Sequence, residues 1–274
     1  MTKILYTWGK GKTGNTCHNG EKKIPTPPSV LVSLNLNQLS LGCNHSAAIV
    51  NGECLMWGEV MGRRHTTLFK IVWKKTVISV SCGTNHTLLL TDDTRVFSMG
   101  LNGAGQLGVD IIDSAVPLPI NVLNRVKVTQ IVAGNQISAA ITANGQLYTW
   151  GTARYGQLAN GRRGEKHQST PTIVLMPIDS APSEHIQWKK VAFGEQHTVA
   201  LAASNAVYAW GMNGRGQLGL GHCNDKLVPV KLNDFSNGSG IKDVTAGGYH
   251  SAALTTDGYI LHVGSQLARS AWHW

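Results

Sequence analysis

Short apolar segments separated by turn-forming residues run along the whole chain, and their lengths suit β-strands. Residues 128–132, 138–141 and 146–150 show this pattern most clearly. The last two segments are joined by Asn144-Gly145, a pair that favours a tight type I′ hairpin because both residues tolerate positive φ. No segment combines a 3.6-residue apolar period with helix caps. The pattern therefore predicts a protein that is almost entirely β.

Two short motifs repeat along the chain in a fixed phase. An aromatic residue followed by Gly recurs about every 51 residues, with Met or Val in place of the aromatic residue in two copies. The pairs are Trp8-Gly9, Trp57-Gly58, Met99-Gly100, Trp150-Gly151, Trp210-Gly211 and Val263-Gly264. A second motif, Gly-x-x-His-Ser/Thr, precedes five of them, and its His slot holds His45, His86, Ile137, His197 and His250. The first copy is one residue shorter than the others between the two slots. Two motifs locked in phase indicate a true internal repeat.

Each repeat is interpreted as a four-stranded antiparallel unit. Turn-forming pairs stand where the middle two strands meet, as at Asn51-Gly52 and Asp257-Gly258. Units of this kind repeated around an axis are the signature of a β-propeller. The expected fold is an all-β propeller of about five blades plus a spare strand, because residues 4–9 and 259–264 occupy the same repeat slot. We expect residues 1–264 to form the repeats and residues 265–274 to be a tail outside them.

A third motif gives the chain a resemblance to a known family. Gly-Gln-Leu-Gly occurs at residues 105–108 and 216–219, and Gly-Gln-Leu-Ala at 156–159. With the other two motifs, from about Leu5 to Gly264, the chain resembles the regulator of chromosome condensation (RCC) repeat family. The resemblance implies a β-propeller, usually of seven blades, which would need about 357 residues at this spacing. The 274 residues here therefore predict fewer repeats than the family usually has.

The repeated His and Trp residues are interpreted as structural. One His in each blade suits a scaffold position, whereas a metal site would need several ligands converging on one point. We expect each imidazole to be hydrogen-bonded within its own blade, and the Trp residues to pack in the core or between blades. The residues concerned are His45, His86, His197, His250, Trp57, Trp150 and Trp210.

The charge balance points to an acidic partner. Lys and Arg number 24 against 15 Asp and Glu, giving a net charge of +9. Charged residues nevertheless make up only 14% of the chain, which excludes a disordered chain and a coiled coil. The basic residues concentrate in loop segments, so one face is expected to bind an acidic protein surface or, second, the DNA backbone; scattered solubilising charge is the alternative. The candidate contacts are Arg63, Arg64, Arg162, Arg163 and Lys166.

No catalytic or cofactor motif accompanies the repeats. Gly-x-Ser-x-Gly, His-Glu-x-x-His and paired-carboxylate patterns are missing. The Gly-Lys-Thr at residues 11–13 has Tyr6 where a phosphate-binding loop needs Gly, and the five Cys residues form no Cys-x-x-Cys pair. We therefore expect no bound cofactor and no metal. The first six residues are too short and too quickly polar for a signal peptide, and no apolar run is long enough to span a membrane. A cytoplasmic or nuclear location is expected.

Two functions remain open. The first is a protein-interaction scaffold whose blade loops form the binding surface. The second, implied by the resemblance, is guanine-nucleotide exchange on a Ran-type small GTPase, with association with chromatin. Exchange needs a wedge that disturbs the nucleotide site, and the insertion at residues 178–187, with Asp179 and Glu184, is the candidate for it. Measuring nucleotide exchange on small GTPases would separate the two functions.

Overall fold

The fold is a set of antiparallel sheets arranged in sequence order. The computed structural model describes residues 7–9, 22–26, 36–164, 167–174, 186–232 and 240–264. A two-stranded sheet of β1 (Thr7–Gly9) and β2 (Lys22–Thr26) comes first. Blade 1 contains β3 (Leu36–Leu41), β4 (His45–Val50), β5 (Glu53–Val60) and β6 (Arg63–Lys70). Blade 2 contains β7 (Val77–Cys82), β8 (His86–Thr91), β9 (Val96–Leu101) and β10 (Asp113–Pro119).

The remaining three blades repeat this order. Blade 3 contains β11 (Val128–Ala133), β12 (Ile137–Thr142), β13 (Leu147–Gly151) and β14 (Gln168–Ile173). Blade 4 contains β15 (Trp188–Phe193), β16 (His197–Ala202), β17 (Val207–Gly211) and β18 (Lys226–Lys231). Blade 5 contains β19 (Ile241–Ala246), β20 (His250–Thr255) and β21 (Ile260–Gly264). One 3-10 helix, η1 (Asn121–Arg125), lies between blades 2 and 3.

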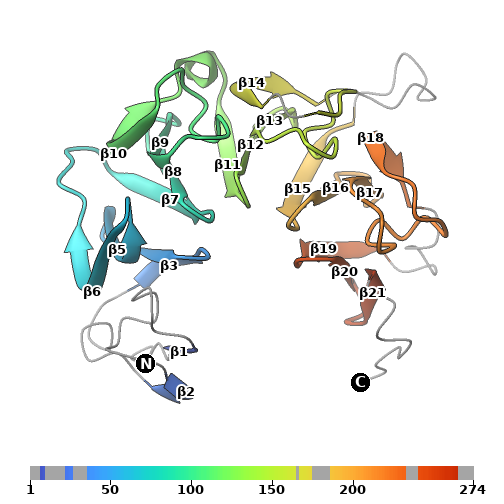
Figure 1. The fold of residues 1–274 in the computed structure, drawn as a ribbon, viewed down its shortest axis with the longest axis horizontal. Coiled ribbons are helices and arrows are strands. Elements are labelled where there is room, and N and C mark those ends of the chain that lie inside the picture. The colour runs from blue at the N-terminus through green and yellow to red at the C-terminus, as the bar shows by residue number, and fades with distance from the viewer. Residues whose placement is uncertain are drawn as a thin grey trace.

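The blades stand around a common axis in an arc (Figure 1). The first strand of each blade is innermost, and the fourth lies on the outer rim. The expected all-β propeller of about five blades is confirmed. Two details differ from the expectation: β1 is not a single spare strand, because it pairs with β2, and blade 5 has three strands among the described residues. The arc is open between the β1–β2 sheet and blade 5.

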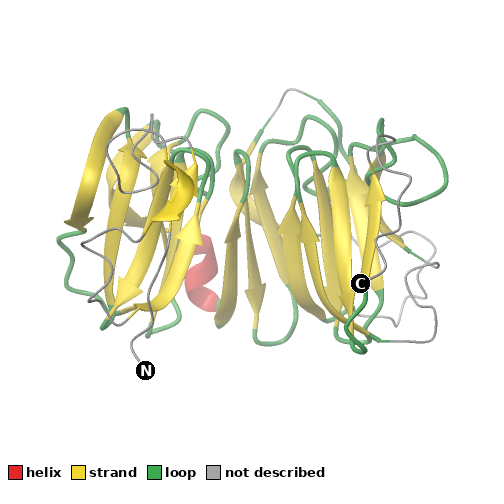
Figure 2. Cartoon of the chain, turned by 90° about the horizontal axis from the view of Figure 1, so that it is seen from below, coloured by secondary structure: helices red, strands yellow, loops and turns green. Residues whose placement is uncertain are grey.

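Antiparallel pairing sorts the connections onto two opposite faces, because successive strands reverse direction. The links between first and second strands, and between third and fourth strands, lie on one face, here called the loop face. The links between second and third strands, and from one blade to the next, lie on the other, here called the hairpin face. Figure 2 shows the strands side-on with loops at both ends.

The hairpin at Asn144-Gly145 is not the expected type I′ turn. Of the two residues, only Gly145 has positive φ, at 76°. The Thr142 N–H donates to Gln146 O at 3.0 Å and the Gly145 N–H to Thr142 O at 2.9 Å. These bonds describe a three-residue loop whose last residue is left-handed. Blades 2, 4 and 5 place Thr94, Asn205 and Gly258 in the same left-handed position.

The type I′ turn is found in blade 1 alone among the described blades. Asn51 and Gly52 have φ of 51° and 78°. The reason is the repeat length noted above: the first copy has one residue fewer between its His and aromatic slots, which leaves room for two loop residues instead of three. Loop length selects the turn type, so the shorter copy takes the tighter turn.

This geometry predicts unequal effects at two adjacent residues. Gly145→Ala should destabilise the protein by about 1–2 kcal/mol, because its backbone is left-handed. The new Cβ would also lie 2.7 Å from Gln187 Cβ. Asn144→Ala should cost less, because its backbone needs no positive φ. Chemical denaturation of both variants tests this, and equal losses would contradict the three-residue loop.

The hydrophobic core is divided into layers between neighbouring blades. Separate buried clusters join blades 1 and 2, blades 2 and 3, blades 3 and 4, and blades 4 and 5. Trp57, Trp150 and Trp210 are each fully buried. The described part of the chain has no helix that is long and apolar enough to cross a membrane.

Candidate interaction face and blade seams

The repeated histidines connect one blade to the next. His86 Nε2 in blade 2 lies 2.8 Å from Ser138 Oγ in blade 3. His45 Nε2 lies 2.7 Å from Thr87 Oγ1, and His197 Nε2 lies 2.9 Å from Ser251 Oγ. The expectation of a partner within the same blade was wrong. Each His reaches the Ser or Thr of the following copy of the same motif.

The contact between one blade and the next is here called a seam. The hydrogen-bond directions at the seams fix the imidazole tautomer. Ser138 Oγ donates to Gln106 O at 2.7 Å, so its hydrogen is not available to His86. His86 must therefore donate from Nε2 to Ser138 Oγ. Its Nδ1 is then a bare acceptor, and it is buried without a hydrogen-bond partner. Gln217 O and Ser251 repeat this arrangement at the seam between blades 4 and 5.

The Gly-Gln-Leu-Gly loops complete the seams. Trp150 Nε1 in blade 3 donates to Gln106 O in the loop of blade 2 at 2.9 Å, and Trp210 Nε1 in blade 4 donates to Gln157 O at 2.8 Å. A Cβ on Gly108 would lie 2.9 Å from Trp150 Nε1, so the loop packs closely over the ring. The loop glycines support tight turns and close packing between blades.

Burial keeps the seam histidines uncharged near neutral pH. It lowers the pKa of His45 and His197 to about 4 and that of His86 to about 3, from an ordinary 6.5. A proton at Nδ1 would create a buried donor without an acceptor, which is unfavourable. The described residues contain no group of three or more His, Cys, Asp or Glu side chains that could hold a metal ion.

The loop face brings together residues from three consecutive blades. Arg63 and Arg64 are exposed at the start of β6, next to the turn that links the third and fourth strands of blade 1. Arg162 and Arg163 are exposed in the corresponding loop of blade 3. Blade 2 lies between them. The expectation that these arginines share one face is consistent with the strand directions, although their role in binding stays a prediction.

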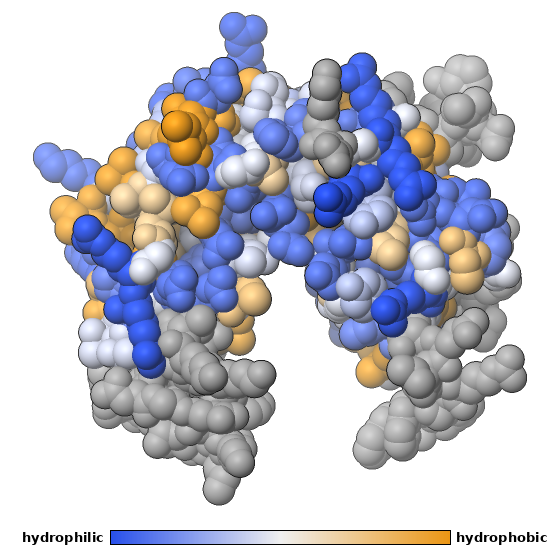
Figure 3. Space-filling view, viewed as in Figure 1, coloured by the Kyte–Doolittle hydropathy of each residue, from blue (hydrophilic) through white to orange (hydrophobic). Residues whose placement is uncertain are grey.

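Blade 2 contributes an apolar patch that the sequence reasoning missed. Ile111 and Ile112, in the loop before β10, are 43% and 85% exposed, and Val116 in β10 is 61% exposed. Figure 3 shows apolar residues gathered over blade 2, with hydrophilic side chains over the neighbouring blades. The sequence signal was a pair of adjacent isoleucines between two aspartates, in a loop rather than in a strand slot.

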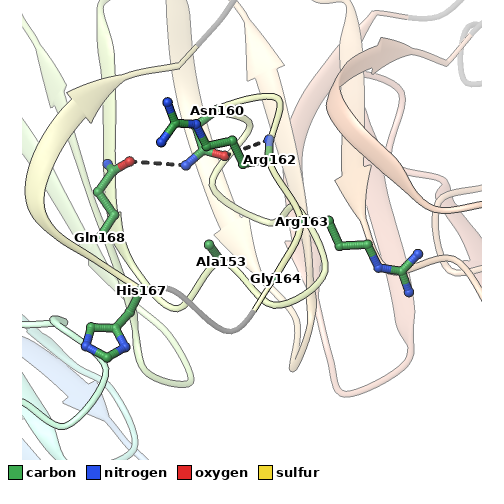
Figure 4. Close-up of a pocket in the computed structure, with 7 residues that line it drawn as sticks. All are labelled: Ala153, Asn160, Arg162, Arg163, Gly164, His167 and Gln168. Carbon is green, nitrogen blue, oxygen red and sulfur yellow. Dashed lines mark hydrogen bonds between the residues drawn. The ribbon is translucent and has the colours of Figure 1, made fainter.

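The two arginines of blade 3 have different surroundings. The Arg163 guanidinium forms an ion pair with Asp225 of blade 4 at 3.1 Å and lies over the Tyr155 ring. The backbone N–H of Arg162 donates to Asn160 Oδ1, beside an open pocket of about 430 Å³ (Figure 4). In that view Arg163 and His167 point away from the pocket. Arg162 is therefore the better candidate for a contact with a partner.

Three of the predicted contact residues lie outside the described residues. They are Lys166, Asp179 and Glu184. Most of the candidate exchange wedge also lies outside them, because residues 175–185 are not described.

Comparisons with known proteins agree with the repeat architecture. The RCC1-like domain model matches residues 4–269. The ultraviolet-B receptor UVR8 of Arabidopsis thaliana is 33% identical over 270 residues, which cover 93% of this chain and 59% of the receptor. The chain thus spans about three fifths of the length of this relative.

Two crystal structures share the fold. Human WBSCR16 has a TM-score of 0.79 at 23% identity, covering 94% of this chain and 70% of the other. Prp20p of Saccharomyces cerevisiae, whose structure was described with its binding to Gsp1p and histones, has a TM-score of 0.68 at 19% identity, covering 95% of this chain and 80% of the other. The shared motifs, the blade order and the match over nearly the whole chain lead to one conclusion: this protein belongs to the RCC1-like domain family.

Proposed function

We propose that the protein is an interaction module that binds an acidic protein surface through its loop face. The observation that carries this proposal is the arrangement of exposed apolar residues in blade 2 between exposed arginines in blades 1 and 3. An apolar centre with a charged rim is the usual organisation of a protein-binding surface. The basic rim would select and steer an acidic partner.

The family relationship supports a binding role without identifying the partner. One fold relative, Prp20p, is described as binding Gsp1p and histones. A propeller frame hosts many functions, so the partner has to be inferred from the surface itself. Guanine-nucleotide exchange is the second candidate, and it rests on the family resemblance alone.

Two loop-face variants with a matched control test the proposal. Ile112→Asp should abolish binding by charging the apolar centre. The triple variant Arg63→Glu, Arg64→Glu and Arg162→Glu should reduce the association rate at least about tenfold by reversing the rim. The control reverses three basic residues on the hairpin face: Lys74→Glu, Arg125→Glu and Lys127→Glu. It changes the net charge equally and should leave binding intact.

The assay uses a panel of purified small GTPases and histone dimers as protein probes and a 20-base-pair DNA duplex as the nucleic-acid probe. Binding is measured by biolayer interferometry at several salt concentrations. We expect at least one protein probe to bind and to respond to the loop-face variants only. Tighter binding to DNA, with a steep linear loss of log affinity in log salt, would contradict a protein partner. Accelerated nucleotide release from a bound GTPase would establish the exchange function.

A further inference from the structure

The hairpin face carries a set of exposed cations that form no ion pair with any described residue. One or two of them lie at the start of each of blades 2 to 5, in the link that leads into the blade or in the second residue of its first strand. They are Lys74, Arg125, Lys127, Lys189 and Lys242. Because the first strand of each blade begins at the hairpin face, all five cations lie at this end of the blades.

Carboxylates on the same face do not balance these cations. Glu53, Asp93 and Asp243 each form an ion pair with another basic residue. The remaining carboxylates of this face, among the described residues, are Asp92 and Asp257 at the hairpin tips of blades 2 and 5. The hairpin face therefore has an excess of positive charge that is spread over four blades.

Exposed aliphatic side chains lie among these cations. Val72, Val122 and Ile173 lie in or next to three successive links between blades, and they are 97%, 49% and 48% exposed. Val72 stands two residues before Lys74, and Val122 stands three residues before Arg125. A single exposed valine is normal on a protein surface. The recurrence of an exposed aliphatic residue at successive links, twice beside a cation, makes this face both apolar and basic.

Core packing on either side holds the two valines outward. Ile71 and Trp73 pack on the buried cluster that joins blades 1 and 2, so the residue between them, Val72, faces solvent. In η1, Leu123 is fully buried and Val122 is exposed. The helix drawn in red in Figure 2 is η1, and it lies toward the lower end of the blades. Because their neighbours are anchored in the core, these valines cannot turn inward without disrupting it.

This combination suits the surface of an anionic lipid bilayer. Lysine and arginine are attracted to acidic headgroups, and aliphatic side chains gain free energy when they enter the boundary between headgroups and acyl chains. A bilayer is flat and accepts separate contacts that are spread over several blades. A protein partner would instead need a continuous apolar centre. Nucleic acid would supply phosphates for the cations but no apolar environment for Val72.

We propose that the protein docks on anionic lipid bilayers through its hairpin face. Val72 and Val122 enter the headgroup region, and the five exposed cations contact acidic lipids. Such docking needs no membrane-spanning helix, because the bound protein lies on the surface of the bilayer. The loop face points away from the membrane and stays open to a protein partner. The docking uses the opposite face and does not depend on the function proposed above.

Sedimentation of the full chain with sucrose-loaded vesicles tests the charge contribution. The vesicles contain phosphatidylcholine alone or phosphatidylcholine with about one third phosphatidylserine. We expect the protein to sediment with the second kind at about 0.1 M salt and far less with the first. The triple variant Lys74→Glu, Arg125→Glu and Lys127→Glu should bind at least about a hundredfold more weakly, because each cation near an anionic bilayer strengthens binding about fivefold.

The loop-face triple variant defined above is the matched control, because it changes the net charge equally. It should bind the vesicles normally. The blade strands are about 20 Å long, so they hold the loop face beyond the Debye length of about 10 Å from the bilayer.

Two single variants separate apolar insertion from charge attraction. Val72→Asp and Asn121→Asp each add one negative charge at an exposed position of the hairpin face. Val72→Asp should weaken vesicle binding at least about fivefold more than Asn121→Asp, because it alone also removes an apolar side chain that enters the bilayer. Both positions are exposed, so both variants should fold, and circular dichroism checks this.

Several results would overturn the proposal. They are no binding to the phosphatidylserine vesicles, equal losses in the two triple variants, and equal losses in Val72→Asp and Asn121→Asp. The DNA duplex used above provides a further comparison. If the protein bound it more tightly than the vesicles, and lost that binding in the hairpin-face triple variant, nucleic acid rather than lipid would be the partner of this face.

Discussion

Lowering the pH from 7 to about 4.5 should sharply destabilise the protein, before most of its carboxylates are protonated. His45, His86 and His197 have folded-state pKa values of about 4, 3 and 4, below the ordinary 6.5. Between about pH 4 and pH 6.5 these histidines are protonated in the unfolded chain but stay neutral in the folded protein. The stability is therefore complete above pH 6.5 and falls as the pH drops toward 4.

The size of this effect follows from the pKa shifts. Each of the three histidines should cost about 1.4 kcal/mol for each pH unit below 6.5. At pH 5 the sum is about 6 kcal/mol, which is comparable with the whole stability of many domains, about 5–15 kcal/mol. Thermal unfolding monitored by circular dichroism should show a nearly constant Tm from pH 8 to 7 and a steep fall below pH 6.5.

A single substitution tests the assignment to the seams. His86→Leu should lower stability at neutral pH, because Ser138 loses a donor, but should flatten the pH dependence by about a third. Blade 3 already carries Ile137 in this slot, so an apolar side chain is compatible with the fold. His167→Leu is the matched control, because His167 is exposed in the loop after β13. If both variants kept the full dependence of stability on pH, the acid sensitivity would have another origin.

The largest loss from one substitution is expected at Trp150. Its ring is fully buried between blades 2 and 3, and its Nε1 donates to Gln106 O at 2.9 Å. Trp150→Ala should destabilise the protein by about 3–5 kcal/mol through the cavity and the lost packing. Trp150→Phe keeps most of the apolar area and loses the indole donor, so a loss of about 1–3 kcal/mol is expected.

A second tryptophan provides the reference for this measurement. Trp73 is only half-buried, and it packs edge-on against Phe97 beside the buried cluster that joins blades 1 and 2. Trp73→Ala should therefore cost clearly less than Trp150→Ala in urea denaturation at pH 7.5. An equal loss would mean that the fully buried tryptophan contributes no more than a half-buried one, which would contradict the expected cost of the cavity.

The sequence determined the β-propeller and the place of its strands. Apolar segments, turn pairs and three motifs in phase were enough, because these signals are local and each blade repeats them. The repeat length also contained the difference between the blade 1 turn and the others, although the Asn144-Gly145 pair was interpreted by residue type alone. Loop length proved the stronger constraint, since one extra residue changes which positions need positive φ.

Tertiary structure decided the partners of these residues. The sequence could not show that His86 bonds Ser138, because each copy of the motif has its own Thr or Ser next to its His, and identical repeats do not distinguish the two. The strand directions placed Arg63 and Arg162 on one face with Ile112 between them. Packing alone revealed that Val72 is exposed between two residues that pack on the core, because three consecutive apolar residues do not show by themselves which of them faces the buried cluster.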